Sequence, residues 1–137
     1  MKKILVAYDG SPNSLNALDQ AVEMARHYNA GMFVVTVIPD VMHIIANETV
    51  KIPTEAKERS IKMVEDVVQS IRKDGIDADG AVLIGDIATK LLKAAEENGC
   101  DLIVIGKRGL NNVDSFLIGS VTEKVVKHTN FSVWVVV

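Results

Sequence analysis

The sequence is poor in cysteine and in aromatic residues, and each of these two shortages disfavours a class of protein. It has one Cys, three Pro, one Trp, two Tyr and three Phe among 137 residues. A single cysteine excludes an intrachain disulfide framework. We expect Cys100, beside the apolar run Leu102–Ile105, to be a small buried hydrophobic residue. So few aromatic rings give little support to a flavin carrier, which usually stacks its ring on them.

Neither an excess of basic charge nor a long apolar run is present. Fifteen Lys and Arg stand against eighteen Asp and Glu, a net charge of -3. The sequence therefore lacks the basic footprint that nucleic acid or anionic lipid requires. No stretch approaches the roughly 18 uninterrupted apolar residues of a membrane span, and the run after Lys3 ends at Asp9, too early for a signal peptide. We expect a cytoplasmic protein with no nucleic-acid or membrane partner.

Short apolar runs rich in Val and Ile recur along the chain and predict strands. Most do not alternate with polar residues, which is typical of strands covered on both faces, as in a parallel sheet. The runs are Ile4–Tyr8, Met32–Ile38, Ala81–Ile84, Leu102–Ile105 and Val133–Val137. Segments with helical spacing lie between them. This alternation predicts a three-layer α/β/α sandwich around a doubly wound, five-stranded parallel sheet, in one domain over residues 1–137.

Helix ends are signalled by capping residues. Ser11 followed by Pro12 predicts one N-cap, and Asp86 predicts another. Ser120 and Glu123 have the spacing of a capping box, with Ser120 as the N-cap. Glycines follow three helical segments, where we expect them to supply a left-handed stop: Gly31, Gly75 and Gly99.

The strongest functional signal follows the fourth predicted strand. Gly106-Lys107-Arg108-Gly109 and Gly119-Ser120 give the spacing Gly-x2-Gly-x9-Gly-Ser. Two glycines let the backbone turn sharply and approach a ligand, and the helix opened by Gly119-Ser120 offers free N–H groups and a positive pole to a phosphate. The hydroxyls of Ser120 and Thr122 can donate to phosphate oxygens. Ordinary turns and a helix cap would explain the same residues, so the spacing alone leaves both interpretations open.

At these residues the chain resembles the universal stress protein family. The likeness extends over essentially the whole chain, through Ile4–Ser11, Gly85-Asp86, Asp101–Gly106 and Gly119–Val126. ATP-binding members of that family carry the same glycine spacing. The resemblance implies an adenine nucleotide alpha hydrolase-like sheet of strand order 3-2-1-4-5. It also implies that ATP is the ligand, with Mg²⁺ or Mn²⁺ bound through the phosphates.

The resemblance also implies a role for individual residues. The carboxylate of Asp9 would accept hydrogen bonds from the ribose hydroxyls, although a turn carboxylate is the simpler interpretation. Three strand-end residues would form the apolar walls around adenine, or else belong to the plain core: Ala7, Val37 and Ile105. The remaining residues would surround the ribose and phosphates: Gly106, Arg108, Gly109, Gly119, Ser120, Val121 and Thr122.

The last predicted strand, Val133–Val137, is almost wholly apolar and has no helix after it. We expect it at an edge of the sheet, where an unpaired strand is an aggregation hazard. Antiparallel pairing with a second copy across a two-fold axis would cover this edge, and the family resemblance implies the same homodimer. A monomer with a short edge strand is the alternative.

Taken with these features, the resemblance implies an ATP-binding, homodimeric regulator of the stress response. No catalytic residue is evident: His43 is the one candidate base, and a solvated loop histidine is the simpler interpretation. We expect at most slow ATP hydrolysis or autophosphorylation. The first alternative is a nucleotide-free interaction module, because Asp114 would repel a triphosphate if it pointed inward. A phosphoryl-accepting receiver is less well supported, because Asp9 has no adjacent acid.

Overall fold

The computed structural model describes residues 1–40, 54–108 and 118–137. Strands and helices alternate along these residues, as the apolar runs predict. The strands are β1 (Lys3–Ala7), β2 (Gly31–Pro39), β3 (Ala78–Gly85), β4 (Leu102–Gly106) and β5 (Ser132–Val136). The helices are α1 (Pro12–Tyr28), α2 (Thr54–Lys73), α3 (Ile87–Glu97) and α4 (Ser120–His128). Gly109, Asp114 and His43 lie outside the described residues.

The strands form one parallel sheet of order β3-β2-β1-β4-β5, which confirms the expected fold class. β1 is central: Val6 pairs with Val34 of β2 on one side and Val104 of β4 on the other. From β1 the chain moves outward through β2 to β3, and then crosses to β4. The order therefore reverses between β1 and β4. In such sheets ligands bind beyond the carboxyl ends of the strands at this reversal.

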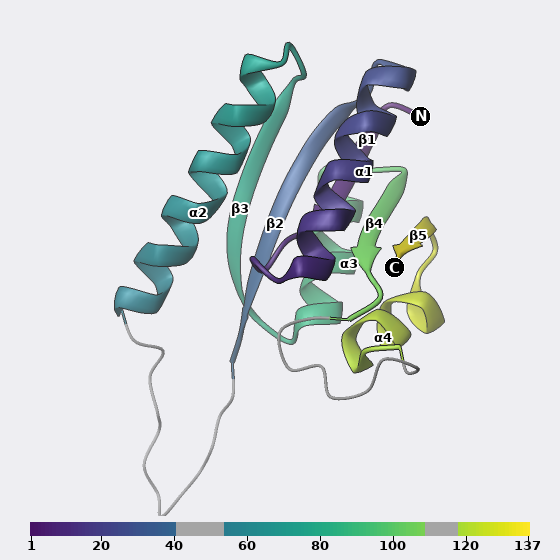
Figure 1. The fold of residues 1–137 in the computed structure, drawn as a ribbon. Helices are drawn as coiled ribbons and strands as arrows, with labels where there is room; N and C mark the ends of the chain where they lie inside the picture. Colours follow the sequence, from purple (N-terminus) through teal and green to yellow (C-terminus); the bar gives the residue numbers. More distant parts are fainter. Residues whose placement is uncertain (41–53, 109–117) are drawn as a thin grey trace, which may run out of the picture.

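Helices cover both faces of the sheet, α1 and α2 on one and α3 and α4 on the other (Figure 1). Side chains alternate along β1 because successive residues of a strand point to opposite faces. Ile4 and Val6 pack under α1 and α2, whereas Leu5 packs under α3 and α4. Cys100 is buried in the second cluster, which confirms the expected hydrophobic role, and burial raises the pKa of its thiol. No helix among the described residues is long and apolar enough to span a membrane.

Most predicted helix ends are confirmed, and two are wrong. Ser11 caps α1 by accepting the Ser14 N–H at 3.2 Å, and Asp86 caps α3. Gly75 and Gly99 have positive φ as expected. Gly31 does not end a helix, because Asn29 takes the left-handed position with φ 54° and Gly31 begins β2. Ser120 is the first residue of α4 rather than its cap; Gly119 is the N-cap and has no side chain to bond with.

The third strand begins earlier than the apolar pattern predicts. β3 starts at Ala78, not Ala81, because Met32 to Val34 of β2 pair with Ala78 to Gly80. Arg72 of α2 supports this start: its Nε donates to the carbonyl of Ala78 at 2.7 Å, and its guanidinium pairs with Asp79 at 2.9 Å. Polar residues are tolerated here because β3 lies at the edge of the sheet.

Candidate functional site

The sequence-predicted residues that the structure describes gather at the carboxyl edge of the sheet, around the reversal between β1 and β4. Ala7 ends β1, and Asp9 follows in the turn to α1. Gly106 ends β4 and Arg108 follows it. The start of α4 joins them, because the Gly119 N–H donates to the carbonyl of Lys107 at 2.8 Å. Residues far apart in the sequence therefore share one place in the fold.

Asp9 is held in a turn closed by its own carboxylate. Its Oδ1 accepts the N–H of Ser11 at 2.9 Å, and its own N–H donates to Ser14 Oγ at 3.3 Å. Gly10 between them has φ 82°, a left-handed conformation that favours glycine. Within the described ranges, Oδ2 of Asp9 accepts no hydrogen bond. The turn role weighed for Asp9 is therefore present, and one carboxylate oxygen remains available for a ligand.

The three apolar residues predicted as adenine walls share one face of the sheet. Ala7, Val37 and Ile105 belong to the hydrophobic cluster beneath α3 and α4, at the carboxyl ends of β1, β2 and β4. Val37 and Ile105 are 9% and 5% exposed. They are thus core residues that present little surface to a ligand, and Ala7 is the more open of the three.

Gly106 is a glycine for a reason that its spacing did not indicate. A Cβ on this residue would lie 2.9 Å from the backbone carbon and oxygen of Asn13 in the first turn of α1. Its φ is not left-handed. The missing side chain therefore lets α1 approach the end of β4, which corrects the expectation of a sharp turn at Gly106. The Gly106 carbonyl accepts the hydroxyl of Thr122 at 2.8 Å.

The first turn of α4 carries backbone donors that have no hydrogen-bond partner in the part of the chain that the structure describes. The backbone N–H groups of Ser120, Val121 and Thr122 precede the first intrahelical bond, from Glu123 N–H to the Gly119 carbonyl at 3.0 Å. Such first-turn groups have no partner within a helix, and the helix dipole makes them attractive to an anion. The Thr122 hydroxyl is buried and already donates to Gly106, so its backbone N–H is the donor left for a ligand. Ser120 is exposed.

Arg108 adds a donor without an acceptor. Among the described residues, its Nε is buried and has no hydrogen-bond partner. A buried N–H without a partner is costly and calls for an explanation such as an absent ion or ligand. A phosphate oxygen is a strong acceptor for a guanidinium donor. The donor set at this edge therefore fits an anionic ligand.

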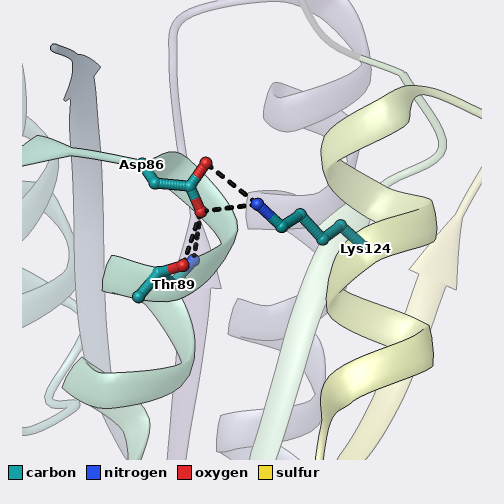
Figure 2. A network of polar contacts seen from close by, with 3 residues as sticks. All are labelled: Asp86, Thr89 and Lys124. Carbon is teal, nitrogen blue, oxygen red and sulfur yellow. Dashed lines mark hydrogen bonds and ion pairs between the residues drawn. The ribbon is translucent and has the colours of Figure 1, made fainter.

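The predicted cap Asp86 also joins α3 to α4, which the sequence did not indicate (Figure 2). Its Oδ2 accepts the N–H and the hydroxyl of Thr89 at 3.0 and 2.5 Å. Nζ of Lys124 lies 3.1 and 3.0 Å from its two carboxylate oxygens. The hydrogen bonds from Thr89 and then from Lys124 lower the pKa of Asp86 to about 2. Asp86 and Lys124 are 38 residues apart in the sequence, and no local pattern links them.

A metal ion has no ready-made set of protein ligands in the described ranges. No three His, Cys, Asp or Glu side chains lie there in a group that could hold one. A divalent ion at this edge would take its oxygen ligands from elsewhere, such as the phosphates of a nucleotide.

Comparison with known proteins assigns the chain to a family. The model of the universal stress protein family matches residues 1–137. A universal stress protein of Bacillus subtilis, YxiE, is 30% identical over 133 residues, which cover 90% of each chain. The solved structure of the universal stress protein UspA from Lactobacillus plantarum has a TM-score of 0.80 at 23% identity, covering 99% of this chain and 97% of that one.

A further solved structure contains a nucleotide. The universal stress protein from Archaeoglobus fulgidus in complex with dAMP has a TM-score of 0.75 at 24% identity, covering all of this chain and 98% of that one. The fold is thus shared along the full length, and the family model and the Bacillus relative agree with it. The chain belongs to the universal stress protein family.

Proposed function

We propose that the edge between β1 and β4 binds ATP, with Mg²⁺ or Mn²⁺ held through the phosphates. The observation that carries this proposal is a set of donors without partners among the described residues: three N–H groups open α4, and Arg108, whose Nε is buried and unpartnered, follows Lys107, whose carbonyl accepts the Gly119 N–H. Backbone donors at a helix N-terminus favour phosphate. The dAMP held by the Archaeoglobus relative supports an adenine nucleotide as the ligand.

The remaining site residues would each contact a different part of the nucleotide. The free Oδ2 of Asp9 would accept a hydrogen bond from the ribose, while Oδ1 stays bonded to Ser11 and fixes the direction of the carboxylate. Ala7, with the edges of Val37 and Ile105, would contact the base on the α3 and α4 side of the sheet. The metal would neutralise phosphate charge. In this proposal the chain binds and orients ATP, and any hydrolysis or autophosphorylation is slow.

We further propose that the protein is a homodimer and responds to nucleotide as a regulator of the stress response. β5 pairs only with β4 among the described strands, so its outer edge is open to a second copy. Antiparallel pairing of two such edges is isologous and closes on itself. An interaction module that binds no nucleotide is the competing function, and ATP affinity separates the two.

The test is calorimetric titration of nucleotide-free protein with ATP and Mg²⁺. Asp9→Asn keeps an oxygen for the Ser11 N–H but removes the charge, and should weaken binding by at least about tenfold, the effect expected for a lost bond to a charged group. Gly119→Val places a branched side chain beside the donors of α4 and should abolish binding. Asp19→Asn, on the exposed side of α1, is the matched control. Failure of the wild-type protein to bind ATP would leave the interaction module as the function.

A further inference from the structure

The helix α4 is short and lacks a side-chain cap, so its placement depends on bonds to its neighbours. It spans nine residues, and its N-cap is Gly119. Two bonds tie its start to the end of β4: Gly119 N–H to Lys107 O and Thr122 Oγ1 to Gly106 O, both at 2.8 Å. These bonds fix one side of the first turn.

The ion pair between Lys124 and Asp86 ties α4 to the rest of the fold on another side (Figure 2). Asp86 is itself held by α3, because it accepts two hydrogen bonds from Thr89. Its carboxylate is therefore an anchored acceptor rather than a mobile surface charge. Lys124 lies four residues after Ser120, so both residues are on the same face of α4. A bond at Lys124 thus restricts rotation of the helix about its axis, and with it the direction of the first-turn N–H groups.

We propose that Lys124 is a positioning residue of the nucleotide site: through Asp86 it holds α4 in the orientation that aims its N-terminal donors at the phosphates. The inference rests on the ATP site proposed above and deepens it. Lys124 does not touch the nucleotide in this scheme. The obvious rival is direct contact between its ammonium group and a phosphate, and the two schemes differ in what removal of Asp86 does.

Four variants test the proposal by calorimetric titration with ATP and Mg²⁺: Lys124→Gln, Asp86→Asn, the double variant and Lys124→Arg. Asn is as good an N-cap as Asp, so Asp86→Asn removes the ion pair and keeps the cap of α3. We expect Lys124→Gln and Asp86→Asn each to weaken ATP affinity by about three- to tenfold. The double variant should bind ATP no more weakly than these single variants, because the two residues act through one ion pair. Lys124→Arg should keep nearly full affinity. The control is Lys127→Gln, which removes an equal charge from α4 but breaks only a pair within the helix, to Glu123.

A second measurement needs no nucleotide. The Glu123 N–H, which donates to the Gly119 carbonyl, closes the first turn of α4. Its hydrogen exchange should be faster in Lys124→Gln and Asp86→Asn than in Lys127→Gln. Unchanged exchange, or wild-type ATP affinity in Lys124→Gln, overturns the positioning role while the ATP site stands. Full or increased affinity in Asp86→Asn with loss in Lys124→Gln overturns it in favour of direct contact. A wild-type protein that does not bind ATP overturns the site and the positioning role together.

Discussion

At the scale of single residues, Gly106 is the position where the structure makes the sharpest demand. A methyl group there would lie 2.9 Å from the backbone carbon and oxygen of Asn13. Because both contacts are to backbone atoms, α1 and β4 would have to move apart to accommodate it. We expect Gly106→Ala to lower the free energy of unfolding by about 1–3 kcal/mol, the usual cost of overpacking. Urea denaturation measures this. Gly31→Ala is the control, because its Cβ would find nothing nearer than 3.5 Å; equal losses in both variants would contradict the argument.

The residues of the site were predictable where the signal is local and not where it is tertiary. Ser11 and Pro12 are adjacent in the sequence and together predict the start of α1. The turn that holds Asp9 is likewise closed by a nearby residue, Ser11. The reason for Gly106 depends on α1, and the bond that occupies the Thr122 hydroxyl spans 16 residues. Spacing alone cannot show contacts of this kind, because they arise only when distant elements pack.

At the scale of elements, α2 lies unusually close to β3. A Cβ on Gly80 would overlap the side chain of Val64 and lie 2.8 Å from Val68 Cγ2. We expect Gly80→Ala to destabilise the fold by about 1–3 kcal/mol by pushing α2 away from the sheet. Shortening Val64 should relieve the closer of these two contacts, while the contact with Val68 remains. The double variant Gly80→Ala/Val64→Ala should therefore be more stable than the sum of the single effects by about 1 kcal/mol. Additive losses in thermal or urea unfolding would show that the two residues do not oppose each other.

Asp86 makes stability depend on pH, because the hydrogen bonds from Thr89 within α3, and then those from Lys124 of α4, favour its ionised carboxylate. The pKa of Asp86 is lowered from 3.8 to about 2, so its ionised form is favoured by folding. Its contribution is fully present above pH 3.8 and is lost as the pH falls through 3.8 towards 2. We expect Asp86→Asn to unfold at a lower temperature than wild type at pH 6, and the difference to shrink below pH 4. Melting curves across this range check it; a constant difference would contradict it.

The elements themselves were largely predictable, and their exceptions have physical causes. Buried strands such as β1 and β4 are continuous apolar runs because helices cover both of their faces. β3 is an edge strand whose first residues include Asp79 and Gly80, so its apolar run begins late. Asn29 replaces glycine at the end of α1 because asparagine also tolerates positive φ. The predicted boundaries therefore differ from the observed ones at an edge strand and at a helix end.

At the scale of the whole molecule, alternation of strands and helices predicts the layers but not the strand order. A chain that continued outward from β3 would have the same local pattern as one that crosses to β4. Here the crossing puts α1 and α2 on one face and α3 and α4 on the other. The same crossing creates the reversal at which the candidate site lies. It also leaves β5, whose residues after Ser132 are all apolar, at the outer edge of the sheet.

The hydrogen bonds between β4 and β5 show which backbone groups of β5 face β4 and which face outward. The Val136 carbonyl accepts the Lys107 N–H at 2.7 Å, on the side of β4. Backbone groups alternate in direction along a strand, so the N–H and carbonyl of Val135 point outward. Proline is tolerated where a strand N–H is not needed by the sheet. We therefore expect Val135→Pro to keep its pairing with β4 and to lose pairing with a second copy.

Sedimentation velocity should show a dimer for the wild-type protein and a monomer for Val135→Pro, with similar circular dichroism. Val135→Thr is the matched control, because it keeps the outward N–H and the shape of valine, and it should remain dimeric. Trp134→Pro removes an N–H on the side of β4 and should destabilise the fold itself. A Val135→Pro protein that stayed dimeric would place the contact between copies on another surface. Since β5 has neither charge nor proline of its own, its short length is then the edge protection that the strand itself supplies.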